Sequence, residues 1–393
     1  MFSPLRRFSI TAFALLALLG ASLGLAVGTG ETANSLATLW SKQPAGSPFA
    51  TVDSHGNVLT AETASPAGIV LTKYDPNGNL VWSGSLADTD AVRAIATDGS
   101  GNVVVASASA VTSVSPNGLV TNFTVTPSAP VLSIAVDPSG NVIVAENEWD
   151  EDLIIAKYDA GGAQLFSKVV SSTGGIEDLS LATDTAGNIV VAAAYQFGAI
   201  DFGGGPLTAP YLDSMVLAKL TSAGQHVFSK VFNPPVAADG TYAGVYTMKV
   251  ACDGKNNIVT AGTLSGMGKF VLGNKSVTLP SPGETTMLLA KFSPTGAISF
   301  VKSIGTDGLY VEALAVDAAG NILTTGENWG SPLFGGVDGV FVAKFNGNGT
   351  LRAGRIIGST SGTAHSIAAD HATGSPVVAG SDFPANYVLK LRP

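Results

Sequence analysis

The stretch DPSGNVIVA at residues 137–145 decides the fold, because its first five residues recur along the chain in related form. The first six copies place glycine fourth and asparagine fifth, with Asn256 replacing the glycine once, and each lies between short apolar segments. Glycine supplies a positive φ angle, and aspartate and asparagine side chains hydrogen-bond their own backbone in tight turns. The pattern therefore predicts tight turns between antiparallel strands, starting at Asp53, Asp98, Asp137, Asp184, Asp253, Asp317 and, in degraded form, Asp370.

The spacing of these turns predicts a repeated unit. Successive turn aspartates lie 45, 39, 47, 69, 64 and 53 residues apart. A second motif, an apolar pair followed by Ala-Lys and a glycine-containing turn, marks a third strand in each unit and contains Lys157, Lys219, Lys291 and Lys344. Units of about 40–50 residues with several strands each are typical of β-propeller blades. We therefore expect blades of four strands, here named A to D in chain order.

A count of the strands predicts how the ring closes. The sequence contains seven copies of strands A, B and C, but only six D strands follow them. Residues 35–42 resemble the D strands, and pairing them with residues 386–391 would remove the exposed sheet edges. We therefore predict an all-β chain that forms one seven-bladed β-propeller of four-stranded blades, closed by the N-terminal strand pairing with the C-terminal blade.

Residues 1–28 have the features of a signal peptide. Arg6 and Arg7 precede an apolar stretch at residues 10–27, and small residues lie near Gly28. We expect the propeller to occupy residues 29–393 of an exported protein that is periplasmic, cell-surface or secreted. The apolar stretch is also long enough to anchor the chain in a membrane if the leader stays uncleaved.

Composition narrows the choice of partners. The net charge is −9, which disfavours nucleic acid because an acidic protein repels phosphate groups. The single cysteine, Cys252, allows no intramolecular disulfide, and its apolar neighbours predict a core residue. We expect a monomer without a cofactor.

The units resemble the bacterial SBBP-type β-propeller repeat. The resemblance rests on the Gly-Asn-apolar segments, the apolar-Ala-Lys strands, the aromatic D strands and the loop segments at residues 201–205 and 382–384. It covers nearly all of residues 35–393, with departures at Asn256 and in the turn at 370–376. The resemblance implies a propeller fold and export, and it implies no activity.

Enlarged loops predict one variable face. The B–C loops at 195–213, 263–284 and 327–338, and the D–A loop at 233–244, should lie on the face opposite the short turns. Aromatic side chains on variable loops suit contact with a protein or a glycan. Alternatively, the loops fold back and bury the same side chains in small cores. The residues concerned are Tyr195, Phe197, Phe202, Tyr211, Tyr242, Phe270, Trp329 and Phe334.

Acidic residues suggest one weak metal site and a set of ion pairs. In the run at 146–152, the side chains of Glu148, Asp150 and Asp152 could hold Ca²⁺, but the run has no EF-hand pattern, and a solvated acidic loop is the favoured interpretation. The turn aspartates are better explained as caps than as metal ligands. We expect the repeated lysines to pair with neighbouring turn carboxylates at the surface, each pair contributing about 0–1 kcal/mol.

No catalytic residue is assigned from the sequence. Only His365, on a predicted inner strand, could line the central channel, and no metalloprotease motif surrounds any histidine. The leading hypothesis is a non-enzymatic binding or scaffold module for a protein or glycan at the cell envelope or outside the cell. The alternatives are a hydrolase or lyase at the channel mouth, marked by a buried His365 beside a carboxylate, and a structural component of a surface layer or matrix.

Overall fold

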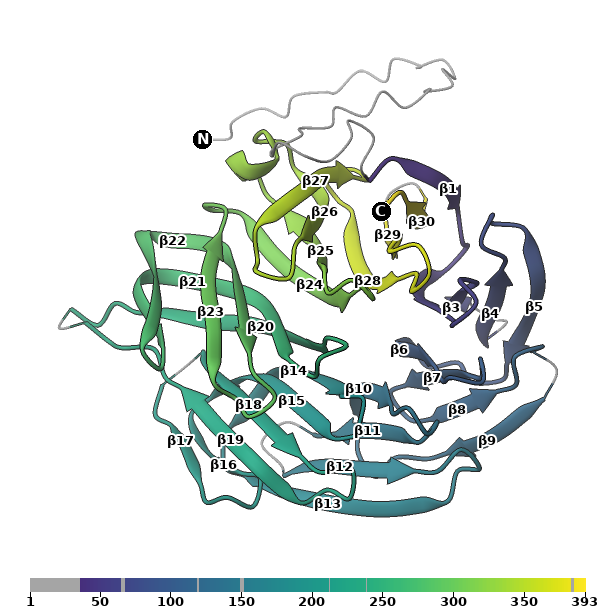
Figure 1. The fold of residues 1–393 in the computed structure, drawn as a ribbon, viewed down its shortest axis with the longest axis horizontal. Coiled ribbons are helices and arrows are strands. Elements are labelled where there is room, and N and C mark those ends of the chain that lie inside the picture. Colours follow the sequence, from purple (N-terminus) through teal and green to yellow (C-terminus); the bar gives the residue numbers. More distant parts are fainter. Residues whose placement is uncertain are drawn as a thin grey trace, which may run out of the picture.

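The computed structural model describes residues 36–64, 68–118, 120–148, 152–211, 213–237, 239–382 and 385–393. The expected leader at 1–28 lies outside these residues. The described chain consists of strands β1 to β30 and one short 3-10 helix, η1 (Pro332–Phe334). The strands form seven sheets arranged in a ring (Figure 1).

The first three blades follow the predicted order of four strands from the centre outward. Blade 1 contains β2 (Ser47–Val52), β3 (Val58–Ala64), β4 (Gly68–Tyr74) and β5 (Leu80–Leu86). Blade 2 contains β6 (Val92–Thr97), β7 (Val103–Ser107), β8 (Val111–Val114) and β9 (Thr121–Val125). Blade 3 contains β10 (Val131–Val136), β11 (Val142–Glu146), β12 (Leu153–Tyr158) and β13 (Gln164–Ser172).

The next three blades keep this order. Blade 4 contains β14 (Gly175–Thr183), β15 (Ile189–Gln196), β18 (Ser214–Leu220) and β19 (His226–Phe232). Blade 5 contains β20 (Ala243–Cys252), β21 (Ile258–Leu272), β22 (Lys275–Phe292) and β23 (Ile298–Ile304). Blade 6 contains β24 (Leu309–Val316), β25 (Ile322–Asn328), β26 (Gly339–Phe345) and β27 (Leu351–Ile357).

Blade 7 confirms the predicted closure. Its inner strands are β28 (Thr363–Ala369), β29 (Pro376–Ser381) and β30 (Tyr387–Leu391), and its outer strand is β1 (Thr38–Lys42). β1 runs antiparallel to β30, with Trp40 opposite Lys390 and Lys42 opposite Val388 (Figure 1). Because β1 and β30, the first and last strands of the described chain, share one sheet, the ring has no gap at this position.

Apolar side chains between successive blades form the core. Ile143 and Ile155 of blade 3, for example, pack in one cluster with Val191 and Val216 of blade 4, and all four are fully buried. The B and C strands read as nearly continuous apolar runs because both of their faces contact a neighbouring blade. This packing replaces the disulfides that a chain with one cysteine cannot form.

Two of the enlarged loops contain strands that the sequence did not predict. Residues 263–284 are largely an extension of β21 and β22, which continue outward as a hairpin that turns at Gly273. Within 195–213, β16 (Gly198–Asp201) and β17 (Leu207–Ala209) form a hairpin that joins the outer edge of blade 3, where Ser171 lies opposite Asp201. The free backbone groups at a sheet edge pair readily with another strand. The insertion of blade 4 therefore covers the outer edge of blade 3.

The repeated turns have the predicted chemistry. Asp137 Oδ1 accepts hydrogen bonds from the backbone amides of Ser139 and Asn141, both at 2.9 Å, and Asn141 Nδ2 donates to Asp137 Oδ2 at 2.8 Å. Gly140 has a φ of +81°, which is accessible to glycine without strain. Asn256, which replaces the glycine in blade 5, adopts a φ of +63°. Turn capping therefore accounts for the repeated aspartates.

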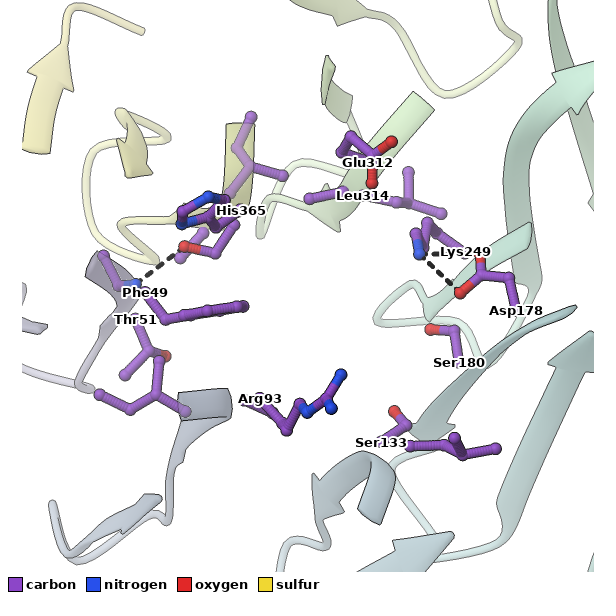
Figure 2. A pocket seen from close by; sticks show the side chains of 18 of the residues that line it. Phe49, Thr51, Arg93, Ser133, Asp178, Ser180, Lys249, Glu312, Leu314 and His365 are labelled. Atoms are coloured by element: carbon purple, nitrogen blue, oxygen red, sulfur yellow. Dashed lines mark hydrogen bonds and ion pairs between the residues drawn. The ribbon is translucent and has the colours of Figure 1, made fainter. Parts of the chain in front are cut away.

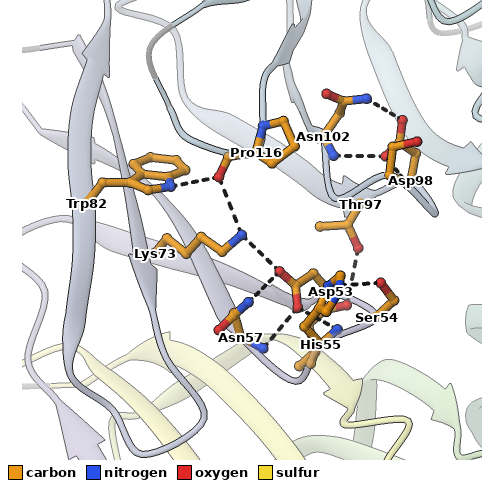
Figure 3. A network of polar contacts seen from close by, with 12 residues as sticks. Asp53, Ser54, His55, Asn57, Lys73, Trp82, Thr97, Asp98, Asn102 and Pro116 are labelled. Carbon is orange, nitrogen blue, oxygen red and sulfur yellow. Dashed lines mark hydrogen bonds and ion pairs between the residues drawn. The ribbon is translucent and has the colours of Figure 1, made fainter.

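The repeated lysines join neighbouring blades, and the prediction that their ion pairs are exposed is wrong. Lys157 Nζ lies 2.8 Å from Asp137 Oδ2 of its own blade and donates to the carbonyl of Ser222 in blade 4 at 2.9 Å. The side chains of Lys157 and Asp137 are each only 3% exposed. We call this arrangement the lysine bridge, and Figure 3 shows the copy formed by Lys73 and Asp53. The other copies use Lys219 with Asp184, Lys291 with Asp253, and Lys390 with Asp370.

An aromatic residue strengthens six of the seven blade interfaces. Trp82 of blade 1 lies over Gly118, in the C–D turn of blade 2, where an added Cβ would lie 2.6 Å from the indole ring. Its Nε1 also donates to the carbonyl of Pro116 at 2.9 Å (Figure 3). The absence of a side chain at the turn glycine thus allows the ring to approach the backbone closely. The other aromatic–glycine pairs are Trp40 with Gly78, Phe123 with Gly162, Phe166 with Gly224, Phe228 with Gly296, and Phe300 with Gly349.

The interface between blades 6 and 7 differs because no C–D turn connects β30 to β1. Among the described residues, no ion pair within 4 Å joins Lys344 to a carboxylate, so the predicted pairing fails there. Arg355 on β27 instead donates to the carbonyl of Leu36 at 2.8 Å and to Thr38 Oγ1 at 3.2 Å. One guanidinium thus connects blade 6 to the closing strand.

Candidate functional site

Exposed aromatic side chains gather on one part of the ring. We call the surface with the short A–B and C–D turns the turn face, and the surface with the B–C and D–A connections the loop face. Five aromatic residues of the described chain are at least 36% exposed, and all five lie on the loop face of blades 4 to 6. They are Phe197 (56%), Tyr211 (45%), Tyr246 (49%), Tyr310 (37%) and Trp329 (59%).

The eight aromatic residues selected from the sequence divide into two groups. Tyr195, Phe202 and Phe270 are fully buried, and Phe334 is 6% exposed, because the inserted hairpins and η1 pack these rings into the core between blades. These four rings are buried, as the alternative predicted, but they join the main core between blades and do not form separate small cores. Of the remaining four, Phe197, Tyr211 and Trp329 are exposed, and Tyr242 is half-buried.

The β-bulges of the inner strands mark a set of residues of which the sequence pattern identified only His365. Arg93, Leu132, Glu312 and His365 line the channel. The innermost strand of each of blades 2 to 7 contains a register shift, and one residue there has no partner on the next strand. Bulges re-aim side chains and occur often beside functional sites. The unpaired residues are Arg93, Leu132, Glu177, Tyr246, Glu312 and His365. Each lies five or seven residues before a turn aspartate, a spacing that could have identified them.

The channel contains a polar cavity of about 250 Å³ (Figure 2). Arg93, Lys249, Asp178, Glu312 and His365 line it from five different inner strands. Lys249 Nζ is paired with Asp178, at 2.8 Å from Oδ1 and 2.7 Å from Oδ2. Burial raises the pKa of Glu312 to about 7, although the charge of Lys249 acts in the opposite direction. The cavity therefore contains one carboxyl group that titrates near neutral pH.

His365 reaches the channel, as predicted, but without a carboxylate partner. Its Nδ1 lies 3.1 Å from the carbonyl oxygen of Pro48, and its Nε2 lies 3.2 Å from Thr363 Oγ1. The ring stacks on Phe49, with 5.2 Å between centroids, and burial lowers its pKa. In the described part of the chain, no carboxylate hydrogen-bonds this ring. The histidine–carboxylate pair that would mark a hydrolase or lyase is therefore not found at His365 in the described chain.

A second cavity, of about 280 Å³, opens on the loop face at blade 5. We call it the rim pocket, and its lining includes Asp213, Tyr242 and Tyr246. Asp213 is only 5% exposed and has a φ of +65°, which is uncommon for a residue other than glycine. Burial raises the pKa of Asp213 to about 6, and the charge of Glu177 raises it further, against a hydrogen bond with Tyr242.

The tyrosines of the rim pocket share this electrostatic environment. The charge of Asp213 is the main cause of the raised pKa of Tyr246, and burial, Glu177 and Tyr310 add to it. Burial also raises the pKa of Glu177, despite a hydrogen bond from Gln196 Nε2 at 2.6 Å. The pocket therefore combines aromatic rings with the carboxyl group of Asp213, and a second acid, Glu177, acts on it from nearby.

The Ca²⁺ hypothesis receives no support from the arrangement of acidic side chains. Glu148 is exposed, Asp152 Oδ1 accepts a hydrogen bond from the amide of Ser172 at 2.8 Å, and Asp150 lies outside the described residues. Within the described ranges, no three His, Cys, Asp or Glu side chains are grouped for metal binding. Cys252 is half-buried against the apolar core, and burial raises the pKa of its thiol to about 12. No helix in the described part of the chain could span a membrane.

Neither a protein-family model nor a curated protein matches the chain. Solved structures are similar, however. The β-propeller domain of Cps50 (Swd1) from Myceliophteria thermophila has a TM-score of 0.56 and 8% identity, over 91% of this chain and 99% of that one. Virginiamycin B lyase from Staphylococcus aureus has a TM-score of 0.57 and 13% identity, over 90% and 98%.

A chain of a mitotic checkpoint complex, with a TM-score of 0.58 and 10% identity, covers 97% of this chain and 99% of its own length. These proteins include a lyase and a member of a protein complex, so the shared architecture does not select an activity. At these identities the likeness shows the fold alone. The chain is a seven-bladed β-propeller.

Proposed function

We propose that the chain is an exported SBBP-type β-propeller that binds a partner protein through the loop face of blades 4 to 6. The observation that carries this proposal is the clustering of Phe197, Tyr211, Tyr246, Tyr310 and Trp329 on that surface. Aromatic residues dominate the binding energy of many protein interfaces, and large exposed apolar patches mark interaction sites. One of the similar structures is a chain of a mitotic checkpoint complex, and this agrees with a protein as the binding partner.

The export component of the proposal rests on the leader at residues 1–28. A positively charged start, an apolar stretch and small residues near Gly28 together favour cleavage after transport across a membrane. The mature chain would act at the cell envelope or outside the cell. N-terminal sequencing of the protein recovered from cell fractions tests this component independently of binding.

One observation favours a second candidate function, a hydrolase or lyase at the channel. Glu312, with a pKa raised to about 7, could exchange a proton with a substrate near neutral pH. The His365 ring, however, is held by Pro48 and Thr363. A Glu312→Gln variant that loses activity in a screen of hydrolase and lyase substrates would favour this candidate over binding.

The binding proposal is tested by capture experiments with a matched pair of variants. In the loop-face variant, Phe197, Tyr310 and Trp329 are changed to serine. In the control variant, Leu80, Leu165 and Val169 are changed to serine, since these residues are also exposed apolar side chains but lie on outer strands. The immobilised mature chain is incubated with envelope and extracellular material, and captured proteins are identified by mass spectrometry.

The proposal predicts that a specific protein is retained by the native chain and the control variant and is lost by the loop-face variant. Circular dichroism and the thermal unfolding midpoint must be unchanged in both variants. Equal capture by all three chains would place the contact elsewhere and overturn the proposed face. Capture of polysaccharide in place of protein would overturn the proposed class of partner.

A further inference from the structure

We propose that the rim pocket binds a cationic lysine or arginine side chain of the partner protein. The proposal rests on the proposed function, because it specifies one contact within that binding face. The pocket brings together Asp213 from the β17–β18 connection, Tyr242 from the β19–β20 connection and Tyr246 from β20. Glu177 on β14 lies close enough for its charge to act on Asp213. A carboxylate beside aromatic rings is a chemical environment that favours an organic cation.

The backbone around Asp213 holds its side chain in place. Its carbonyl oxygen accepts a hydrogen bond from the amide of Val245 at 2.8 Å, which ties the end of the blade 4 insertion to β20. Gly244 packs against it so closely that an added Cβ would lie 2.2 Å from the Cβ of Asp213. A positive φ at a buried aspartate is a cost that the surrounding contacts must offset, and such conformations cluster at ligand sites.

The size of the pocket fits a single side chain. Its volume of about 280 Å³ is below that of most sites for drug-sized ligands, which occupy roughly 300–1,000 Å³. Tyr242 and Tyr246 provide aromatic walls, and Ser265 and Met267 complete the lining. An extended lysine or arginine stem could contact the rings while its charged end reaches the carboxylate of Asp213.

Among the described residues, no ion pair within 4 Å gives Asp213 or Glu177 a counter-ion. β14 contributes Glu177 and Asp178, β24 contributes Tyr310 and Glu312, and β20 contributes Lys249. Lys249 is already paired with both carboxylate oxygens of Asp178. Burial is the main cause of the raised pKa values of Asp213 and Glu177, and the charge of Glu177 raises the pKa of Asp213 further. A bound cation would relieve this repulsion.

The test uses the full mature chain and small probes of defined charge. The probes are Nα-acetyl-lysine methylamide and Nα-acetyl-arginine methylamide, with the norleucine derivative as the uncharged control. Binding is followed by NMR shifts of ring-labelled tyrosines. The variants are Asp213→Asn, which preserves the tolerance of a positive φ, and Tyr246→Leu. Asp338→Asn, an exposed aspartate on the loop face of blade 6, is the matched control.

The proposal predicts saturable binding of the two cationic probes, weakened about tenfold by Asp213→Asn and by Tyr246→Leu, and unchanged by Asp338→Asn. Affinity should rise as the pH increases through about 6, because Asp213 then ionises. Equal affinity for the norleucine probe, or native affinity in Asp213→Asn, would overturn the proposal, as would Ca²⁺ competing for the same tyrosine shifts.

Partner capture separates this proposal from the proposed function. If Asp213→Asn still captures the partner as tightly as the native chain while the loop-face variant does not, the binding face stands and the cation contact is rejected. If the cationic probes bind as predicted while no partner is captured, the rim pocket stands and the protein-binding function is rejected.

Discussion

The turn face and the loop face of the ring use charged residues in opposite ways. On the turn face, Asp137 and Lys157 form a buried pair at 2.8 Å, and the capping amides satisfy the remaining carboxylate oxygen. On the loop face, Asp213 is equally buried but lies near another acid and has no ion pair within 4 Å among the described residues. The Asp137–Lys157 pair stabilises the fold. The Asp213 carboxylate is left to pair with a cationic group of a ligand.

The same contrast holds for aromatic residues. Trp82 and its counterparts cover the turn glycines of the next blade, whereas the Trp329 side chain is exposed and its Nε1 donates to Glu327 at 3.2 Å. Uniform turns allow one interface to be repeated around the ring. Variable connections carry residues that the ring does not need, which is why binding is proposed there.

The largest expected effect is on the turn face. Replacing Lys157 with methionine leaves Asp137 buried without its counter-ion and removes the bond to Ser222, so the free energy of unfolding should fall by about 3 kcal/mol. Urea denaturation followed by circular dichroism measures the change. Lys344→Met is the matched control at the interface that lacks a lysine bridge, and it should cost far less. Equal losses in the two variants would contradict a special role for the bridge.

The pH dependence of stability should have opposite signs for the paired aspartates of the turn face and for the buried acids of the rim pocket and the channel. Burial raises the pKa of Asp137, but Lys157 and Asn141 lower it more, so the folded value lies below 3.8. Its contribution is present above pH 4 and is lost as the pH falls through the folded pKa. Asp213 and Glu312, with pKa values of about 6 and 7, bind protons more tightly when folded, so their contribution decreases as the pH rises from about 4 to 7.

The sign expected for Asp213 and Glu312 is checked with an Asp213→Asn/Glu312→Gln variant. Its free energy of unfolding and that of the native chain are measured at pH 5 and pH 8. The variant should gain stability relative to the native chain at pH 8, because neutral amides remove the cost of ionising buried acids. A difference between the two chains that does not change with pH would contradict it. Asp338→Asn serves as an exposed control.

The smallest expected change in stability follows from replacing an exposed aromatic residue of the loop face. Trp329→Ala should change the free energy of unfolding by no more than about 0.5 kcal/mol, because its side chain is mostly in solvent. Replacing Phe341, a fully buried aromatic residue of the same blade, with alanine should lower the free energy of unfolding by about 3–5 kcal/mol. Thermal and urea unfolding of the two variants provide the comparison. A large loss in Trp329→Ala would show that the residue is structural.

Much of the fold could be predicted because its determinants are local. The Asp137 turn depends on hydrogen bonds among five consecutive residues, and the count of D strands was sufficient to assign residues 35–42 to the closing position. The predicted link between repeated lysines and turn aspartates was correct for Lys157, Lys219 and Lys291. Its failure at Lys344 coincides with the one interface where a C–D turn is missing.

By itself, the sequence determined the repeated turns, the four-strand unit, the number of blades and the closure of the ring, since each depends on chemistry between near neighbours or on counting. Only the tertiary structure decided that the lysine bridges are buried, that Tyr195 and Phe270 are enclosed while Tyr246 and Trp329 are exposed, and that bulges turn Arg93 and Glu312 toward the channel. Burial depends on which distant segments cover a residue, and no local pattern records that.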